Sequence, residues 1–145
     1  MSLKKDRKRI VVAIDTSPHA DSIVERAAEL ASLTGADVNI VTVIDTAIIP
    51  AEGEAITIDD RERNIVNHHR YLIEKYFSNT SGTLIESVTL YGDAADKICE
   101  IAEKVNADLV VIGSRGLSKI QSVLLGSVSE KVIKKCSKSV LIVKV

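Results

Sequence analysis

The sequence predicts an α/β protein: a three-layer α/β/α sandwich around a five-stranded parallel sheet in the strand order 3-2-1-4-5. Five short segments rich in Val and Ile alternate with segments of helical periodicity, which implies right-handed parallel crossovers. The chain is 46% hydrophobic but only 3% aromatic, so aliphatic residues must build its core, as in a parallel sheet covered by helices. A chain of 145 residues is expected to form one domain over residues 1–145.

The first strand and helix are predicted from an apolar run and the turn residues after it. Residues 9–14 read as a buried strand that ends at Asp15. Ser17 is the expected N-cap of the next helix, with Pro18 in the first helical position. The helix is expected to end near Gly35, which suits the C′ position.

The second strand and helix are separated by a longer loop. Residues 37–44 form the strand, with Asp45 just beyond its end. Residues 46–56 have no clear period and contain Pro and Gly, which predicts a loop. Thr57 is the expected N-cap of a helix whose apolar stripe includes His69.

The third strand and helix have a more polar pattern. Residues 83–90 alternate, but Glu86 interrupts the apolar face, which indicates an edge strand. Asp93 is the expected N-cap of the next helix, with Asp96 at N3, and the helix is expected to end at Asn106.

The remaining elements follow the same alternation. Residues 109–112 form a strand buried on both faces, residues 127–135 a helix, and residues 140–145 the last strand. Cys99 and Cys136 fall on apolar faces of predicted helices, so we expect small core residues rather than a disulfide.

Composition excludes several classes of function. The net charge of −1 and the pI of about 6.3 carry no nucleic-acid footprint. The N-terminal residues lack the apolar region of a signal peptide. No apolar run approaches the length of a membrane span, so a cytoplasmic protein without a membrane partner is expected.

The ligand-binding segment is expected between the fourth strand and the fourth helix. Gly113, Gly116 and Gly126 have the spacing G-x2-G-x9-G, and Ser127 follows at the helix start. Glycines let a ligand approach the backbone, and a helix N-terminus offers free N–H groups and the positive end of the dipole. The pattern favours a bound phosphate, although the spacing matches neither GxxxxGK[ST] nor GxGxxG.

The sheet order predicts what lies near this segment. Ligands of such folds bind at the carboxyl ends of the strands, where the winding reverses. With strands one and four as central neighbours, residues 13–15 and 113–119 line the crevice, and the second strand adds Val43 and Asp45.

Gly113-Ser-Arg-Gly116 and Gly126-Ser127-Val128-Ser129 resemble the nucleotide-binding branch of the universal stress protein family, whose motif is G-2x-G-9x-G-[S/T]. The resemblance extends from VAIDTS at residues 12–17 to SVLIVKV at residues 139–145. It implies a Rossmann-like fold and a site for an adenine nucleotide: ATP, or AMP or ADP.

The resemblance also implies a role for each site residue. Adenine would lie at Ala13 and Val43, and Asp15 near the ribose or a metal, Mg²⁺ or Mn²⁺. The glycine loop and the following helix start would hold the phosphates. The implied nucleotide-binding residues are Ala13, Asp15, Val43, Gly113, Ser114, Arg115, Gly116, Leu117, Ser118, Lys119, Gly126, Ser127, Val128 and Ser129.

The last strand and the catalytic inventory bear on the biological role. Residues 140–145 are apolar on both faces at a sheet edge, which predicts antiparallel pairing with a second copy, and the resemblance implies the same homodimer.

Three readings stay open: a nucleotide-binding stress-response or signalling dimer with little turnover, a slow metal-dependent nucleotide hydrolase, and an interaction module without nucleotide. No general base accompanies Asp15 and Ser127, which favours the first over the second, and the intact glycines argue against the third.

Overall fold

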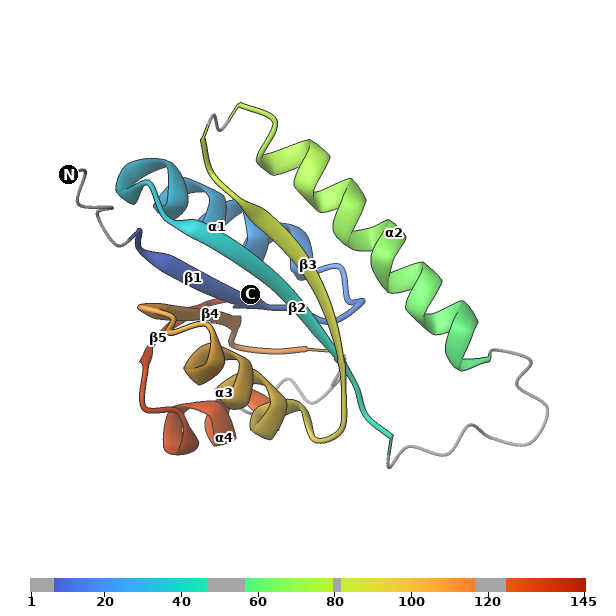
Figure 1. The fold of residues 1–145 in the computed structure, drawn as a ribbon. Helices are drawn as coiled ribbons and strands as arrows, with labels where there is room; N and C mark the ends of the chain where they lie inside the picture. Colours follow the sequence, from blue (N-terminus) through green and yellow to red (C-terminus); the bar gives the residue numbers. More distant parts are fainter. Residues whose placement is uncertain (1–6, 47–56, 80–81, 117–124) are drawn as a thin grey trace.

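The structure is a computed structural model that describes residues 7–46, 57–79, 82–116 and 125–145. Within these residues, five strands form one parallel sheet in the order β3-β2-β1-β4-β5, as the sequence predicts (Figure 1). β1 lies at the centre, and β3 and β5 form the edges. The strands are β1 (Arg9–Ala13), β2 (Asp37–Ile44), β3 (Ile85–Tyr91), β4 (Leu109–Gly113) and β5 (Ser139–Val143).

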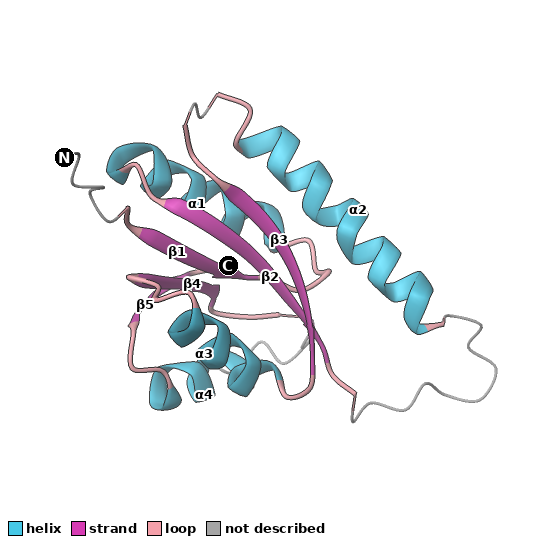
Figure 2. Cartoon of the chain, in the orientation of Figure 1, coloured by secondary structure: helices cyan, strands magenta, loops and turns pink. Residues whose placement is uncertain are grey.

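Helices cover both faces of the sheet, so the expected α/β/α sandwich is confirmed (Figure 2). The helices are α1 (Ala20–Thr34), α2 (Ile58–Tyr76), α3 (Ala94–Lys104) and α4 (Ser127–Lys135). Buried side chains of α1 and α2 join one core cluster, and those of α3 and α4 join the other. None of these helices is long and apolar enough to cross a membrane.

Alternate residues of the central strands enter opposite cores. Val12 of β1 and Val111 of β4 are buried in the cluster that includes α1, whereas Val11 and Val110 are buried in the cluster that includes α3. Because both faces of these strands are covered, their sequences read as continuous apolar runs. The ends of β1 and β4 are thereby held side by side at the middle of the sheet.

Three of the predicted helix caps are confirmed. Gly35 has a φ of 70°, and its left-handed conformation ends α1. Thr57 Oγ1 accepts from Asp60 N at 3.1 Å in a capping box at the start of α2. The Asp93 side chain accepts from Asp96 N at 3.1 Å at the start of α3.

The predicted N-cap of α1 is wrong. The helix begins at Ala20 with His19 as N-cap, so Pro18 precedes the helix. The reason lies in the preceding turn, where the backbone N–H of Ser17 donates to Asp15 Oδ1 at 2.8 Å. The Ser17 carbonyl accepts from Ala20 N at 3.2 Å in the same turn, and the Ser17 hydroxyl is buried with no hydrogen-bond partner among the described residues, so it caps no N–H group of α1.

Both edge strands differ slightly in extent from the prediction. β3 begins at Ile85 rather than 83, and Glu86, which interrupts its apolar pattern, accepts from Asn39 Nδ2 at 3.1 Å. β5 spans Ser139–Val143 rather than 140–145. The expectation that β3 is an edge strand is confirmed.

The prediction of two unbridged cysteines is wrong, because Cys99 and Cys136 form a disulfide with a Cα–Cα distance of 5.1 Å. Cys99 lies in α3, and Cys136 is the C-cap residue of α4. The two helices pack side by side on one face of the sheet, where Lys135 also pairs with Asp96 (Figure 1). Their packing brings together two cysteines that periodicity alone assigns to separate helices.

A buried histidine links α2 to the sheet. His69 is 0% exposed, as its place on the apolar stripe predicts. Its Nε2 lies 2.7 Å from Thr42 Oγ1 of β2, and its Nδ1 lies 2.6 Å from Ser87 Oγ of β3. Burial, with a smaller effect from the charge of His68, lowers the pKa of His69 from 6.5 to about 4.

We therefore expect stability to fall as the solution becomes acidic. In unfolded chains the pKa of His69 returns to its ordinary value, so below that value the unfolded state binds the proton that the folded state excludes. The free energy of unfolding should drop by about 2 kcal/mol between about pH 7 and pH 5. Urea unfolding across this range should show the drop in the parent and in a His19→Gln control, but a much smaller one in His69→Gln. An unchanged slope in His69→Gln would contradict the assignment.

Candidate functional site

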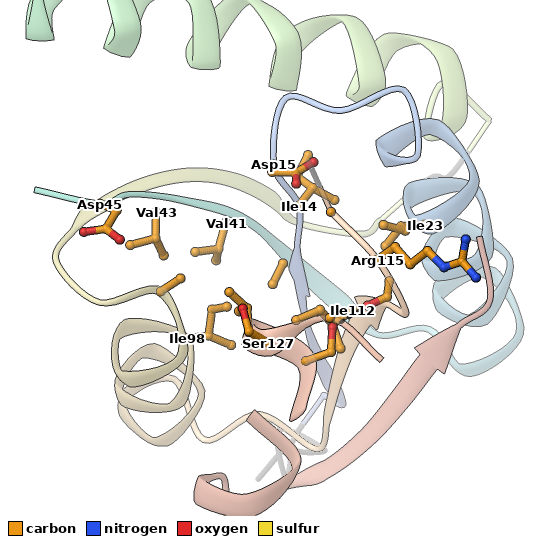
Figure 3. A pocket seen from close by; sticks show the side chains of 17 residues that line it. Ile14, Asp15, Ile23, Val41, Val43, Asp45, Ile98, Ile112, Arg115 and Ser127 are labelled. Atoms are coloured by element: carbon orange, nitrogen blue, oxygen red, sulfur yellow. Dashed lines mark hydrogen bonds between the residues drawn. The ribbon is translucent and has the colours of Figure 1, made fainter. Parts of the chain in front are cut away.

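A cavity of about 290 Å³ opens where β1, β2 and β4 end (Figure 3). The described residues that directly follow these strands and the N-terminal ends of α3 and α4 complete its walls. This is the crevice that the sheet order predicts. Ten residues of the expected site line it: Ala13, Asp15, Val43, Gly113, Arg115, Gly116, Gly126, Ser127, Val128 and Ser129.

Four other residues of the expected site do not line the described cavity. Ser114 is buried beside it, with 6% of its surface exposed. Leu117, Ser118 and Lys119 lie outside the described residues. The middle of the glycine segment is therefore known only from the sequence.

One half of the cavity is apolar. Val41 and Val43 project from β2, and Ala94 and Ile98 face them from α3 (Figure 3 labels all but Ala94). Sequence reasoning missed the contribution of α3. The available signal was Asp93, because a cap places the first turn of that helix at the carboxyl edge of a parallel sheet. The same reasoning also missed three aliphatic residues of the wall, Ile23, Val41 and Ile112, whereas Ile14 lies within the predicted range 13–15.

The other half is formed by backbone at the start of α4. The first bond within the helix runs from Glu130 N to Gly126 O at 3.0 Å, so the N–H groups of Ser127, Val128 and Ser129 have no partner within α4. Gly126 is the N-cap residue, so no side chain stands in front of them. Figure 3 shows Ser127 in the middle of the cavity and Arg115 at the end opposite Asp45.

The fold does not require glycine at position 126. Its φ of −66° and ψ of 159° suit any residue. A Cβ there would lie 3.5 Å from Ser114 O and 3.7 Å from Arg115 Cα, which are ordinary contacts. By contrast, a Cβ on Gly113 would lie 2.6 Å from Ile23 Cδ1, so packing explains that glycine. Without a side chain at Gly126, a ligand can approach the N–H groups that follow it in α4 more closely.

Two carboxylates lie at the ends of adjacent strands. Asp15 follows the end of β1, and Asp45 follows β2. Asp15 Oδ1 accepts from Ser17 N, while Oδ2 lies 2.5 Å from the point where a Cβ on Gly116 would stand. Asp15 thus faces the glycine segment and is the carboxylate placed to hold a cation there. The described residues contain no group of three or more His, Cys, Asp or Glu suited to a metal ion.

Two hydroxyls of the expected site have structural partners. Ser129 Oγ donates to Gly113 O at 2.6 Å and ties the first turn of α4 to the end of β4. Ser114 Oγ accepts from Val145 N at 3.1 Å. Among the described serines of the expected site, Ser127 is the one whose side chain is exposed at the cavity.

Comparison with known proteins agrees with this architecture. The model of the universal stress protein family matches residues 6–144. Universal stress protein MJ0531 of Methanocaldococcus jannaschii is 33% identical over 140 residues, which cover 94% of this chain and 82% of that protein.

Two solved structures of similar proteins carry a nucleotide. A universal stress protein in complex with cAMP has a TM-score of 0.72 and 29% identity, covering 95% of this chain and 97% of its own. The universal stress protein from Archaeoglobus fulgidus in complex with dAMP has a TM-score of 0.66 and 28% identity, covering 93% and 96%. With the fold, the family match and these relatives in agreement, the chain belongs to the universal stress protein family.

Proposed function

We propose that this chain binds an adenine nucleotide, with ATP as the main ligand, in the cavity at the carboxyl edge of the sheet. The observation that carries the proposal is Gly126. Neither its backbone angles nor its packing requires glycine, yet it stands before the open N–H groups of α4. An anion that approaches this backbone explains the residue, and phosphate is the anion that helix N-termini commonly bind.

The two halves of the cavity suit the two ends of a nucleotide. The base lies between the β2 residues Val41 and Val43 and the α3 residue Ile98, and the phosphates lie at the start of α4. Burying an apolar base contributes about 2–3 kcal/mol, and each charge-assisted hydrogen bond to phosphate roughly 1.5–3 kcal/mol. After association costs, about −8 kcal/mol remains, which corresponds to a micromolar complex.

A divalent cation is part of this proposal. Mg²⁺ is usually held by one or two carboxylates together with substrate phosphates. Asp15 meets this description because its carboxylate faces Gly116, beside the proposed phosphate position. The cation supplies charge neutralisation for the phosphates. Arg115, at the same end of the cavity, adds a positive charge.

The relatives support the choice of base. cAMP and dAMP, the ligands named for the two solved structures, both carry adenine. We extend this to ATP because the glycine segment is long enough to surround more than one phosphate.

We further propose a homodimeric stress-response or signalling protein with little turnover. Val140 to Val143 at the β5 edge are only half-buried within one copy, and an apolar edge strand invites antiparallel pairing. Nucleotide occupancy would then act by shifting conformational populations. Hydrolysis needs a residue that positions water, and among the described residues the polar side chains of the cavity wall are those of Asp15, Asp45, Arg115 and two serines.

One experiment separates this role from its alternatives. Isothermal titration with ATP and Mg²⁺ should give a dissociation constant on the order of micromolar. The same samples should release less than one phosphate per site over hours and should scatter light as dimers. Multiple turnovers would instead support a slow hydrolase, and absence of binding would support an interaction module. A strict monomer at high micromolar concentration would contradict the pairing of β5.

A further inference from the structure

Ser114 connects three parts of the chain next to the cavity. It follows β4 directly, and 6% of its surface is exposed. Its backbone N–H donates to Val143 O at 2.8 Å, and its carbonyl accepts from Gly126 N at 2.7 Å. Its hydroxyl oxygen accepts from Val145 N at 3.1 Å. The residue is thus bonded to the end of β5, to the second residue beyond that end, and to the N-cap of α4.

The bonds of Ser114 reach both ends of the glycine segment, which runs from Gly113 to Gly126. Gly113 and Gly116 lie toward the first end of this segment, and Gly126 is its last residue. The bond from Gly126 N to the Ser114 carbonyl fixes the N-cap of α4 relative to the end of β4. The bond from Val145 N in turn fixes Ser114 from the far side.

Two of the residues that form hydrogen bonds with Ser114 are held in place by hydrophobic packing. Val143 and Val145 pack against the core cluster that includes α1. The segment from 143 to 145 therefore joins the β5 edge to the cavity wall, although neither Val143 nor Val145 lines the cavity.

We propose that Ser114 is a positioning residue that couples residues 143–145 at the end of β5 to the phosphate-binding start of α4. The inference rests on the nucleotide site proposed above. The hydrogen bonds of Ser114, here called the Ser114 clamp, set the position of Gly126 and thereby the affinity for phosphates. The apolar half of the cavity, where the base is proposed to lie, is not part of this clamp. Because binding linkage is reciprocal, an occupied phosphate site also stabilises the end of the β5 edge, where a second copy or another chain would pair.

Paired substitutions at position 145 test the bond without altering the cavity wall. Val145→Pro removes the N–H, while Val145→Ala keeps it and removes only side-chain packing. Ser114→Ala removes the accepting oxygen from the other side. We expect Val145→Pro and Ser114→Ala each to weaken ATP binding about tenfold, because a buried polar group is left without its partner. The Val145→Ala control should stay within about twofold of the parent.

Three further readouts distinguish positioning from a general loss of structure. The affinity for adenosine, which lacks phosphates, should be unchanged in all variants. The Ser114→Ala/Val145→Pro double variant should bind ATP no more weakly than either single variant, because both remove the same bond. Hydrogen exchange at the Gly126 amide should accelerate in both single variants without any ligand present.

The possible outcomes distinguish failure of the Ser114 clamp from failure of the proposed nucleotide binding. ATP affinity within about twofold of the parent in both Ser114→Ala and Val145→Pro would overturn the clamp alone. Equal losses for ATP and adenosine would also overturn it, since they indicate a structural effect. A parent protein that binds neither ligand would overturn the nucleotide site and the clamp together.

Discussion

Gly126→Val is expected to weaken ATP binding roughly 100-fold or more, because a branched side chain would stand between the phosphates and the N–H groups of α4. Loss of two or three charge-assisted hydrogen bonds accounts for this size. The fold should tolerate the change. A Cβ at this position makes only ordinary contacts, and the loss of a glycine N-cap costs about 1 kcal/mol or less.

Calorimetric titration with ATP and with adenosine would measure the effect, and urea unfolding would check the fold. Adenosine should still bind, because the base half of the cavity is untouched. Gly126→Ala serves as a graded variant and should lose about tenfold, since its methyl group is smaller than the valine side chain. ATP affinity in Gly126→Val close to that of the parent would place the phosphates elsewhere.

Removal of the Cys99–Cys136 disulfide should lower the free energy of unfolding by about 4 kcal/mol. The cysteines are 37 residues apart, and the chain-entropy model gives a cost of this size for opening a loop of that length. For a chain of this length the melting temperature should fall by roughly 10 °C. The effect arises mainly in the unfolded ensemble, which the cross-link restricts.

Thermal unfolding with and without a reductant would test this stability difference. The Cys99→Ala/Cys136→Ala variant is the control, because its melting temperature should equal that of the reduced parent and should not respond to reductant. Titration of thiols in the oxidised, denatured parent should find none. Equal melting temperatures for oxidised and reduced parent protein would contradict the predicted contribution.

Periodicity and capping residues were enough to predict most of the fold. β2 has the predicted bounds, and α4 spans the predicted residues 127–135. Both rest on patterns that are local in sequence. Ser17 shows the limit of this approach, because its residue type favours a cap but its hydroxyl is buried without a hydrogen-bond partner in the described part of the chain, and the helix begins only at Ala20.

The site was predicted less completely than the fold, because the sequence does not give the direction in which a side chain points. A sequence shows which residues carry hydroxyls but not where those hydroxyls point. Ser129 and Ser114 were expected at the phosphates, and their oxygens instead bond Gly113 O and Val145 N. Ile98 was recognised as apolar, but its place at the open end of the core depends on how α3 packs. The disulfide depends on the same packing of α3 against α4.

The disulfide also changes the topology of the segment that carries the motif. Gly113, Gly116 and Gly126 all lie between Cys99 and Cys136, so β4, the glycine segment and α4 belong to one covalent ring. A single proteolytic cut anywhere in this ring leaves the two fragments joined. On a gel, the cut protein would migrate as one band until a thiol is added, and would then separate into two. The motif thus lies in a loop of the chain that the Cys99–Cys136 disulfide closes.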